Sequence, residues 1–297
     1  MERQCVATIG FFDGVHRGHQ CLVSQVCRLA HELCCPSLVI TFDKHPRQVL
    51  HSDYIPQLLS TLAEKKTLLE ATGIDLLEVL PFTPELSRLT ALQFMQKVLR
   101  DKLNVKTLVM GYDHRFGCGG GEFPDYVEWG RQTGINVVLA RELEGEKVSS
   151  SRIRRFLAEG DVRQANSLLG YCYSLQGEVV SGHQVGRHIG FPTANLRVQD
   201  DKLLPALGVY AVRVTVEDEA TYDGMLCIGH RPTLNNGDEL SVEANLFDFN
   251  GDLYGKKVTL SLVDRLRDEQ SFPSVQALQQ QLEQDAIQAR RKLDIGH

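Results

Sequence analysis

The sequence lacks the features of several classes of protein. It has no run of about 18 consecutive apolar residues, which a transmembrane helix would need. It also lacks a basic excess, because 32 Lys and Arg residues stand against 38 Asp and Glu residues. Nucleic-acid-binding proteins normally carry the opposite balance. We therefore expect small-molecule partners, no nucleic acid and no membrane, while weak self-association stays open.

Cysteine motifs for metal binding are missing as well. None of the eight cysteines forms a C-x-x-C pair, and most lie in apolar contexts, where cysteine acts as a small hydrophobic residue. The N-terminal residues lack the apolar core of a signal peptide. We expect reduced thiols in a cytoplasmic protein, without zinc.

The first half of the chain alternates short apolar runs with helical patterns. Strands are expected at 6–11, 37–42, 76–80, 107–111 and 137–140, and helices at 18–33, 61–71, 92–103 and 125–132. Strand and helix repeated in this way indicate a mainly parallel sheet covered on both faces. We therefore predict an α/β domain over residues 1–170.

The pattern changes near Ser151. Two short helices are expected at 151–158 and 162–169, followed by strands at 172–180, 209–215, 224–228, 242–249 and 257–263 and a last helix at 275–293. Asn- and Gly-rich turns separate the strands, as hairpins require. We predict an antiparallel β-barrel with a C-terminal helix over residues 171–297.

Two histidines follow the first expected strand. His16 and His19 are three residues apart at the start of a helix, so their side chains project the same way, and Gly14 and Gly18 permit close approach of a ligand. The helix start favours phosphate. Taken alone, such a pair is more often a cap and a surface residue. The position at a strand's carboxyl end favours a ligand site.

A Gly-rich segment at 182–195 ends in Pro-Thr-Ala-Asn. Thr193 and Asn195 carry oxygen ligands on the same face of an extended backbone, where both could meet one Mg²⁺. Alone, this tetrapeptide is more often a turn. Glu243 lies in an expected strand between Val242 and Ala244, a setting where an unpaired carboxylate is costly, although a solvated face is the other interpretation.

The segment 8–19 resembles the H-x-G-H signature of nucleotidyltransferases, in the form of bacterial bifunctional riboflavin kinase/FAD synthetases. The blocks 41–47, 111–117 and 148–154 match in the same order. The resemblance implies a Rossmann-like FMN adenylyltransferase domain, with His16 and His19 catalytic and with flavin contacts at His45 and Arg47. The ATP-binding residues that it implies are Gly10, Phe12, Asp13, His16, His19, Asp113, Ser150, Ser151 and Arg154.

The segment 182–195 is similar to the signature of riboflavin kinases. That resemblance implies that Thr193 and Asn195 coordinate Mg²⁺, that Glu243 is the catalytic base, and that Arg267 and Glu269 contact the flavin or ADP. The kinase ATP-binding residues that it implies are Gly182, Gly186, Arg187, Gly190, Pro192, Thr193 and Asn195.

Together the resemblances imply that the protein phosphorylates riboflavin to FMN with ATP and then adenylylates FMN to FAD, releasing pyrophosphate. Lys44 and His114 depart from the family's usual Pro and Phe. They motivate an alternative, a riboflavin kinase whose first domain is slow or inactive. A flavin-responsive regulator would need a basic helix and loss of the Glu243 chemistry, and the sequence has neither.

Overall fold

The computed structural model describes residues 4–50, 57–112, 114–145, 147–181, 190–217, 219–232 and 238–294. The chain divides into two compact units, Met1–Ser150 and Ser151–His297. This division joins the two helices that precede the barrel to the second unit. The expected functional boundary after residue 170 stays a prediction. None of the helices in the described ranges is long and apolar enough to span a membrane.

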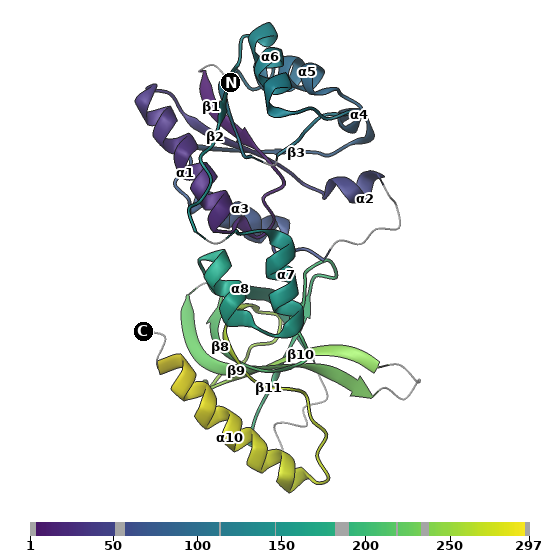
Figure 1. Ribbon diagram of the computed structural model, residues 1–297. Coiled ribbons are helices and arrows are strands. Elements are labelled where there is room, and N and C mark those ends of the chain that lie inside the picture. Colours follow the sequence, from purple (N-terminus) through teal and green to yellow (C-terminus); the bar gives the residue numbers. More distant parts are fainter. Residues whose placement is uncertain are drawn as a thin grey trace. The chain divides into compact units, whose positions relative to one another are not determined.

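The first unit contains a five-stranded parallel sheet (Figure 1). Its strands are β1 Cys5–Ile9, β2 Ser37–Phe42, β3 Leu76–Leu80, β4 Val105–Met110 and β5 Asn136–Leu139. The order β3-β2-β1-β4-β5 places the first strand in the middle. The loops after β1 and β4 therefore leave the sheet at the point where the strand order reverses, which is where open α/β sheets bind ligands.

Helices cover both faces of this sheet, as expected. They are α1 Arg17–Glu32, α2 Pro46–Leu50, α3 Leu62–Glu70, α4 Pro84–Ser87, α5 Ala91–Phe94 and α6 Phe123–Thr133, with a 3₁₀ turn η1 at Asp13–Val15 and a π-helix η2 at Met95–Arg100. One face packs on α1 and α3 through apolar residues such as Val23, Val39 and Leu69. The other packs on α5, η2 and α6 through residues such as Ile40 and Tyr126.

The second unit is a closed barrel with a long C-terminal helix (Figure 1). The strands are β6 Ser174–Val180, β7 Ala194–Val198, β8 Gly208–Val216, β9 Ala220–Pro232, β10 Asp238–Leu246 and β11 Lys257–Arg267. They pair antiparallel in the order β10-β7-β6-β11-β8-β9. The helices are α7 Ser150–Glu159, α8 Val162–Leu169 and α10 Val275–Asp294. Ala289 and Leu293 of α10 pack against Val209, Ala211 and Met225 of the barrel.

The sequence patterns predicted this architecture, although they did not indicate the short helices α2 and α4. Two further differences concern a strand and a helix. The strand β7 is not among the expected strands, because it begins inside the Gly- and Pro-rich segment at 182–195. The single helix expected at 92–103 consists of the short helix α5 and the π-helix η2. Both differences leave the fold class unchanged: a Rossmann-like α/β unit followed by an antiparallel barrel and a helix.

Candidate active sites

The loop between β1 and α1 places two histidines together. His16 is the N-cap of α1, and its Nδ1 accepts a hydrogen bond from the backbone N–H of His19 at 3.4 Å. The two imidazole rings stack with centroids 3.6 Å apart and planes 15° apart. The sequence interpretations of His16 as a cap and as part of a paired cluster therefore both hold. Because an N-terminal helix end has free N–H groups, the pair lies where an anion is favoured.

His19 lies among groups that can carry a positive charge. Burial lowers its pKa well below 6.5, and the charges of His16, His114 and Lys65 lower it further. The Nδ1 atom of His19 is buried and has no hydrogen-bond partner among the described residues. Phe12 packs edge-on against the His19 ring, with the centroids 5.2 Å apart. The imidazole is therefore neutral at pH 7 and retains a ring nitrogen for a ligand.

The Asp13 side chain is engaged by the protein itself. Its carboxylate accepts hydrogen bonds from the backbone N–H groups of Leu59 and Ser60, at 3.0 Å and 3.1 Å. Its backbone carbonyl accepts a hydrogen bond from the Ser150 hydroxyl at 3.2 Å. This contact brings the start of the 148–154 block to the histidine loop. Gly10 lies under the Phe12 ring, where a side chain would be crowded.

These contacts do not test the roles that the sequence assigns to the residues of this site. Ser151 and Arg154 lie on α7 in the second unit, so their approach to ATP stays a prediction. His45 accepts a hydrogen bond at Nδ1 from the Arg47 backbone N–H at 3.1 Å, and both precede or begin α2. Their role in flavin binding also stays a prediction.

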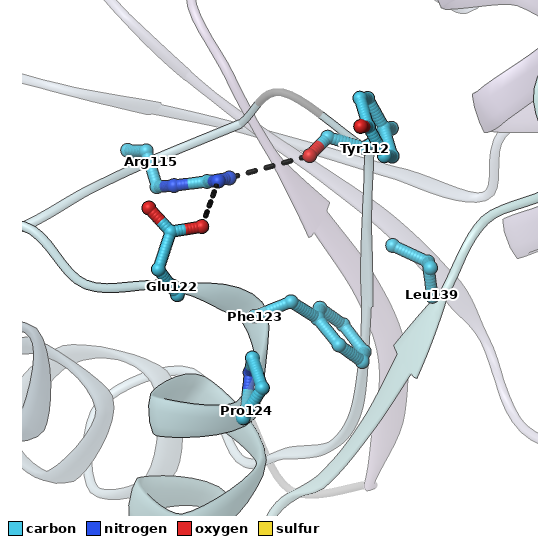
Figure 2. A pocket seen from close by; sticks show the side chains of 6 residues that line it. All are labelled: Tyr112, Arg115, Glu122, Phe123, Pro124 and Leu139. Atoms are coloured by element: carbon cyan, nitrogen blue, oxygen red, sulfur yellow. Dashed lines mark hydrogen bonds and ion pairs between the residues drawn. The ribbon is translucent and has the colours of Figure 1, made fainter.

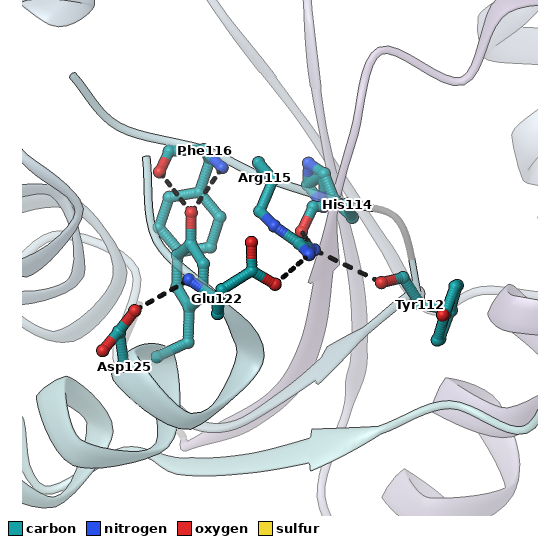
Figure 3. Close-up of polar contacts among 7 residues, drawn as sticks. Tyr112, His114, Arg115, Phe116, Glu122 and Asp125 are labelled. Atoms are coloured by element: carbon teal, nitrogen blue, oxygen red, sulfur yellow. Dashed lines mark hydrogen bonds and ion pairs between the residues drawn. The ribbon is translucent and has the colours of Figure 1, made fainter. Parts of the chain in front are cut away.

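The loop after β4 is held by a polar network (Figure 3). The Arg115 guanidinium donates to the carbonyls of Tyr112 and His114, at 3.2 Å and 3.0 Å, and to the Glu122 carboxylate at 2.8 Å. The Tyr126 hydroxyl bridges the backbone N–H and carbonyl of Phe116. These contacts hold the segment that carries His114 near His19. Asp113 lies outside the described residues.

A cavity of about 380 Å³ opens beside this loop (Figure 2). The Arg115–Glu122 ion pair lies at its edge. Its lining residues are Tyr112, Arg115, Glu122, Phe123, Pro124 and Leu139. Since two of them belong to the 111–117 block, we treat the cavity as part of the first site.

The second site is on the barrel. The Thr193 hydroxyl donates a hydrogen bond of 3.0 Å to Oε2 of Glu243. Asn195 on β7 and Glu243 on β10 are directly opposite in the antiparallel ladder, so their side chains lie on one face. Val242 and Ala244 are buried on the other face. The structure therefore brings together the three residues that the sequence indicated for kinase chemistry.

The segment before β7 is partly described. The Pro192 carbonyl accepts a hydrogen bond from the Asn245 side chain at 2.8 Å, and Phe191 packs against the apolar cluster under α10. Gly190 has a φ of 81°, which favours glycine. Gly182, Gly186 and Arg187 lie outside the described residues.

The expected flavin residues of the barrel have protein partners. Arg267 at the end of β11 forms a two-pronged ion pair with Asp285 of α10, at 2.7 Å from Nη2 to Oδ2 and 3.0 Å from Nε to Oδ1. Glu269 accepts a hydrogen bond from the His230 backbone N–H at 2.9 Å. Cys227 lies opposite Glu243. Desolvation and the Glu243 carboxylate raise the pKa of that thiol to about 11, with Glu269 and Asp285 adding to the shift and Arg267 opposing it.

Several buried charges were not expected from the sequence, and the two least exposed are on helices. Lys65 on α3 and Asp285 on α10 are 2% and 1% exposed. Each occupies an apolar stripe: Lys65 lies four residues before the buried Leu69, and Asp285 lies four and eight residues before the buried Ala289 and Leu293. A charged residue at an apolar position of a helix could have indicated these buried groups from the sequence, because a buried charge requires a partner.

Comparison with known proteins identifies both units. A family model described as FAD synthetase matches residues 1–152, and one described as Riboflavin kinase matches residues 169–293. A bifunctional riboflavin kinase/FMN adenylyltransferase from Listeria monocytogenes is 38% identical over 96% of this chain and 91% of its own length. One from Bacillus subtilis is 36% identical over 98% of this chain and 93% of its own length.

A solved structure also matches nearly the whole chain. The crystal structure of a protein from Streptococcus pneumoniae, described as a macrolide-efflux protein, has a TM-score of 0.88 at 34% identity and covers 98% of this chain and 95% of that one. Both halves of the sequence match their expected family models, and these matches give no support to the kinase-only alternative. The chain belongs to the family of bifunctional riboflavin kinases/FMN adenylyltransferases.

Proposed function

We propose that this chain makes FAD from riboflavin with two separate sites. The second unit transfers the γ-phosphoryl group of ATP to the 5′-hydroxyl of riboflavin, and the first transfers AMP from a second ATP to FMN, releasing pyrophosphate. The observation that carries this proposal is the pairing of two constellations on one chain, the stacked His16 and His19 and the hydrogen-bonded Thr193 and Glu243. The free state of all eight cysteines supports a reducing compartment, the cytoplasm.

Glu243 is the base of the kinase reaction. Its carboxylate takes the proton of the riboflavin 5′-hydroxyl while that oxygen bonds to the γ-phosphorus and the bond from the γ-phosphorus to the β-bridging oxygen breaks, leaving ADP. The Thr193 hydroxyl supports this role because it donates to Oε2 and holds the carboxylate in one orientation.

Thr193 and Asn195 are the residues that would hold Mg²⁺. A hydroxyl and an amide oxygen fit this ion, because Mg²⁺ prefers oxygen ligands and takes few from the protein when ATP phosphates supply others. The pairing of Asn195 with Glu243 supports the assignment, since it puts these oxygens on one face. When bound, the ion would neutralise phosphate charge. Arg267, the last residue of β11, and Glu269, two residues after it, contact the flavin or ADP.

His16 and His19 stabilise the phosphates during adenylyl transfer. An oxygen of the FMN phosphate bonds to the α-phosphorus of ATP as the bond from that phosphorus to the pyrophosphate oxygen breaks, so no protein nucleophile is needed. His16 Nδ1 accepts a hydrogen bond from the His19 backbone, so the ring carries its proton at Nε2, the atom that we assign as a donor to a phosphate. Ser150, Ser151 and Arg154 hold the remaining phosphate oxygens, and His45 and Arg47 contact FMN.

The flavin product profile tests both assignments. Full-length protein is incubated with riboflavin, ATP and Mg²⁺, and FMN and FAD are separated chromatographically. His19→Ala should stop FAD formation and spare FMN formation, whereas His31→Ala, an exposed histidine of the same helix, should change neither. Glu243→Gln should stop FMN formation, and Glu178→Gln on an exposed barrel position should not. FMN accumulation without FAD in the unaltered protein would favour the kinase-only alternative.

A further inference from the structure

The loop that carries the histidines has a strained backbone. Phe12 and Val15 adopt left-handed conformations with φ values of 55° and 35°. Residues with a side chain rarely adopt such values, and a β-branched residue does so least readily. Strain of this kind persists only where the surrounding structure holds it, and it is concentrated at functional sites. The groups that hold this loop are therefore part of how His16 and His19 are presented.

One set of holding contacts comes from the segment before α3. The backbone N–H groups of Leu59 and Ser60 donate to the Asp13 carboxylate, and the Gly14 N–H donates back to the Ser60 hydroxyl at 3.0 Å. The next residue, Thr61, starts α3 with a capping box to Glu64. These hydrogen bonds attach the histidine loop to the start of α3.

The second set comes from a buried lysine on the same helix. The Lys65 ammonium donates to the carbonyl of Phe11 at 3.1 Å and to the carbonyl of Phe42 at 2.9 Å. Its Nζ lies 3.9 Å from the centroid of the Phe11 ring. The Phe11 carbonyl also accepts from the Thr41 hydroxyl at 3.1 Å. Lys65 therefore ties the chain leaving β1 to the end of β2, directly before the strained loop.

The charge of Lys65 also reaches the histidines. Burial lowers the pKa of Lys65 to about 8, while Asp13 and Asp43 raise it, so the ammonium is mostly charged at pH 7. His16, His114 and Lys65 are the three neighbouring groups whose positive forms lower the pKa of His19. A side chain that only filled space here would require neither the charge nor two carbonyl partners.

We propose that Lys65 is a positioning residue for adenylyl transfer, fixing the ends of β1 and β2 so that His16 and His19 face the phosphates of ATP. The proposal rests on the assignment of adenylyl transfer to the first unit. Lys65 does not touch the reacting atoms. It acts through the Phe11 carbonyl on the loop and through its charge on His19.

The test compares Lys65→Met with Lys66→Met in the full-length protein. Lys66 is the exposed neighbour on the same helix and makes a matched control. FAD formation from FMN and ATP should slow by about tenfold to a hundredfold in Lys65→Met, mainly in kcat, because misplacing a catalytic group by about 1 Å costs that much. Riboflavin phosphorylation by the second unit should stay within about twofold, and Lys66→Met should match the unaltered protein in both reactions.

A second readout separates positioning from simple support of the fold. The ring protons of His19, followed by NMR, should titrate at higher pH in Lys65→Met, because one neighbouring positive charge is lost while His16 and His114 remain. An unmoved His19 titration would overturn the proposal, as would FAD formation within about threefold of the unaltered protein.

Folding of the first unit is checked by the fluorescence of Trp129, the sole tryptophan, during urea unfolding. If Lys65→Met lacks a cooperative transition, Lys65→Gln replaces it, since glutamine keeps two N–H donors and removes the charge. Unaltered FAD formation in Lys65→Gln would overturn the proposal. Absence of FAD formation in the unaltered protein would instead refute the proposed function, so the two failures are distinguishable.

Discussion

The ion pair between Arg267 and Asp285 makes a quantitative prediction about the second unit. Asp285 is 1% exposed and accepts three hydrogen bonds from Arg267, whose side chain is 14% exposed, and one from Gln281. Removing one partner of a buried ion pair costs about 3–5 kcal/mol, because the other charge stays buried without a counter-charge. In Asp285→Asn the amide oxygen still accepts one bond and Arg267 keeps some solvent contact, so we expect about 2–3 kcal/mol.

The assay is urea unfolding of the second unit, followed by far-ultraviolet circular dichroism and by loss of riboflavin phosphorylation. With a denaturant slope of about 2 kcal/mol per molar, the midpoint should fall by about 1 M. The matched control is Asp248→Asn, which removes an ion pair made by Arg290 of the same helix. Arg290 and Asp248 are 48% and 79% exposed, so the midpoint should not move measurably.

The outcome that refutes the reasoning is an Asp285→Asn shift no larger than the Asp248→Asn shift. A second comparison tests the cause of the cost. Replacing Arg267 and Asp285 together by Met and Leu removes both charges, so most of the lost stability should return. Circular dichroism alone follows this variant, because Arg267 is assigned to flavin or ADP contact. If the double variant is as unstable as Asp285→Asn, the cost comes from lost packing rather than from the unpaired guanidinium.

Three further predictions concern the first unit, each read from Trp129 fluorescence in urea. Gly117 and Gly119 have φ values of 84° and 86°, but a side chain at Gly117 would overlap the Ala91 backbone, whereas Gly119 has open space. Gly117→Ala should therefore cost more than about 3 kcal/mol and Gly119→Ala only about 1 kcal/mol; equal costs would contradict the packing argument. Because burial lowers the pKa of Lys65 from 10.5 to about 8, the unfolded chain binds more protons between these pH values, so stability rises with pH in that window. Lys65→Met should remove that rise. An unchanged dependence of stability on pH in this variant would show that Lys65 does not cause the rise. Thr61→Ala removes the capping box of α3 and should cost about 1 kcal/mol, and no loss would mean that tertiary packing alone fixes the helix start.

The sequence predicted the α/β unit, the barrel and the final helix because their apolar periodicities are clear. The strand β7 escaped because only five residues form it and Gly and Pro residues precede it. Its existence follows from pairing with β6 and with β10, and β10 lies more than 40 residues further along the chain. Non-local pairing is the information that a local pattern omits.

The candidate sites were predicted in part for the same reason. Motif positions such as His16, Thr193 and Glu243 are visible in the sequence, and the structure brings Thr193 and Glu243 together across 50 positions. The partners of Lys65 could not be predicted, because they are backbone carbonyls 54 and 23 positions away and every residue has such a carbonyl. Contacts to backbone carbonyls are therefore visible only in the structure.

The thiol of Cys227, opposite the proposed kinase base Glu243, has a consequence for handling the protein. A group with a pKa of about 11 is ionised in roughly one molecule in 10⁴ at pH 7, and the thiolate is the reactive form of cysteine. Cys227 should therefore react slowly with maleimides and peroxides at neutral pH, even though it lies beside Glu243. Riboflavin phosphorylation should therefore survive storage in air at neutral pH better than treatment with an alkylating reagent at alkaline pH. Fluorophores could be attached at another exposed cysteine, such as Cys34, without blocking the barrel face.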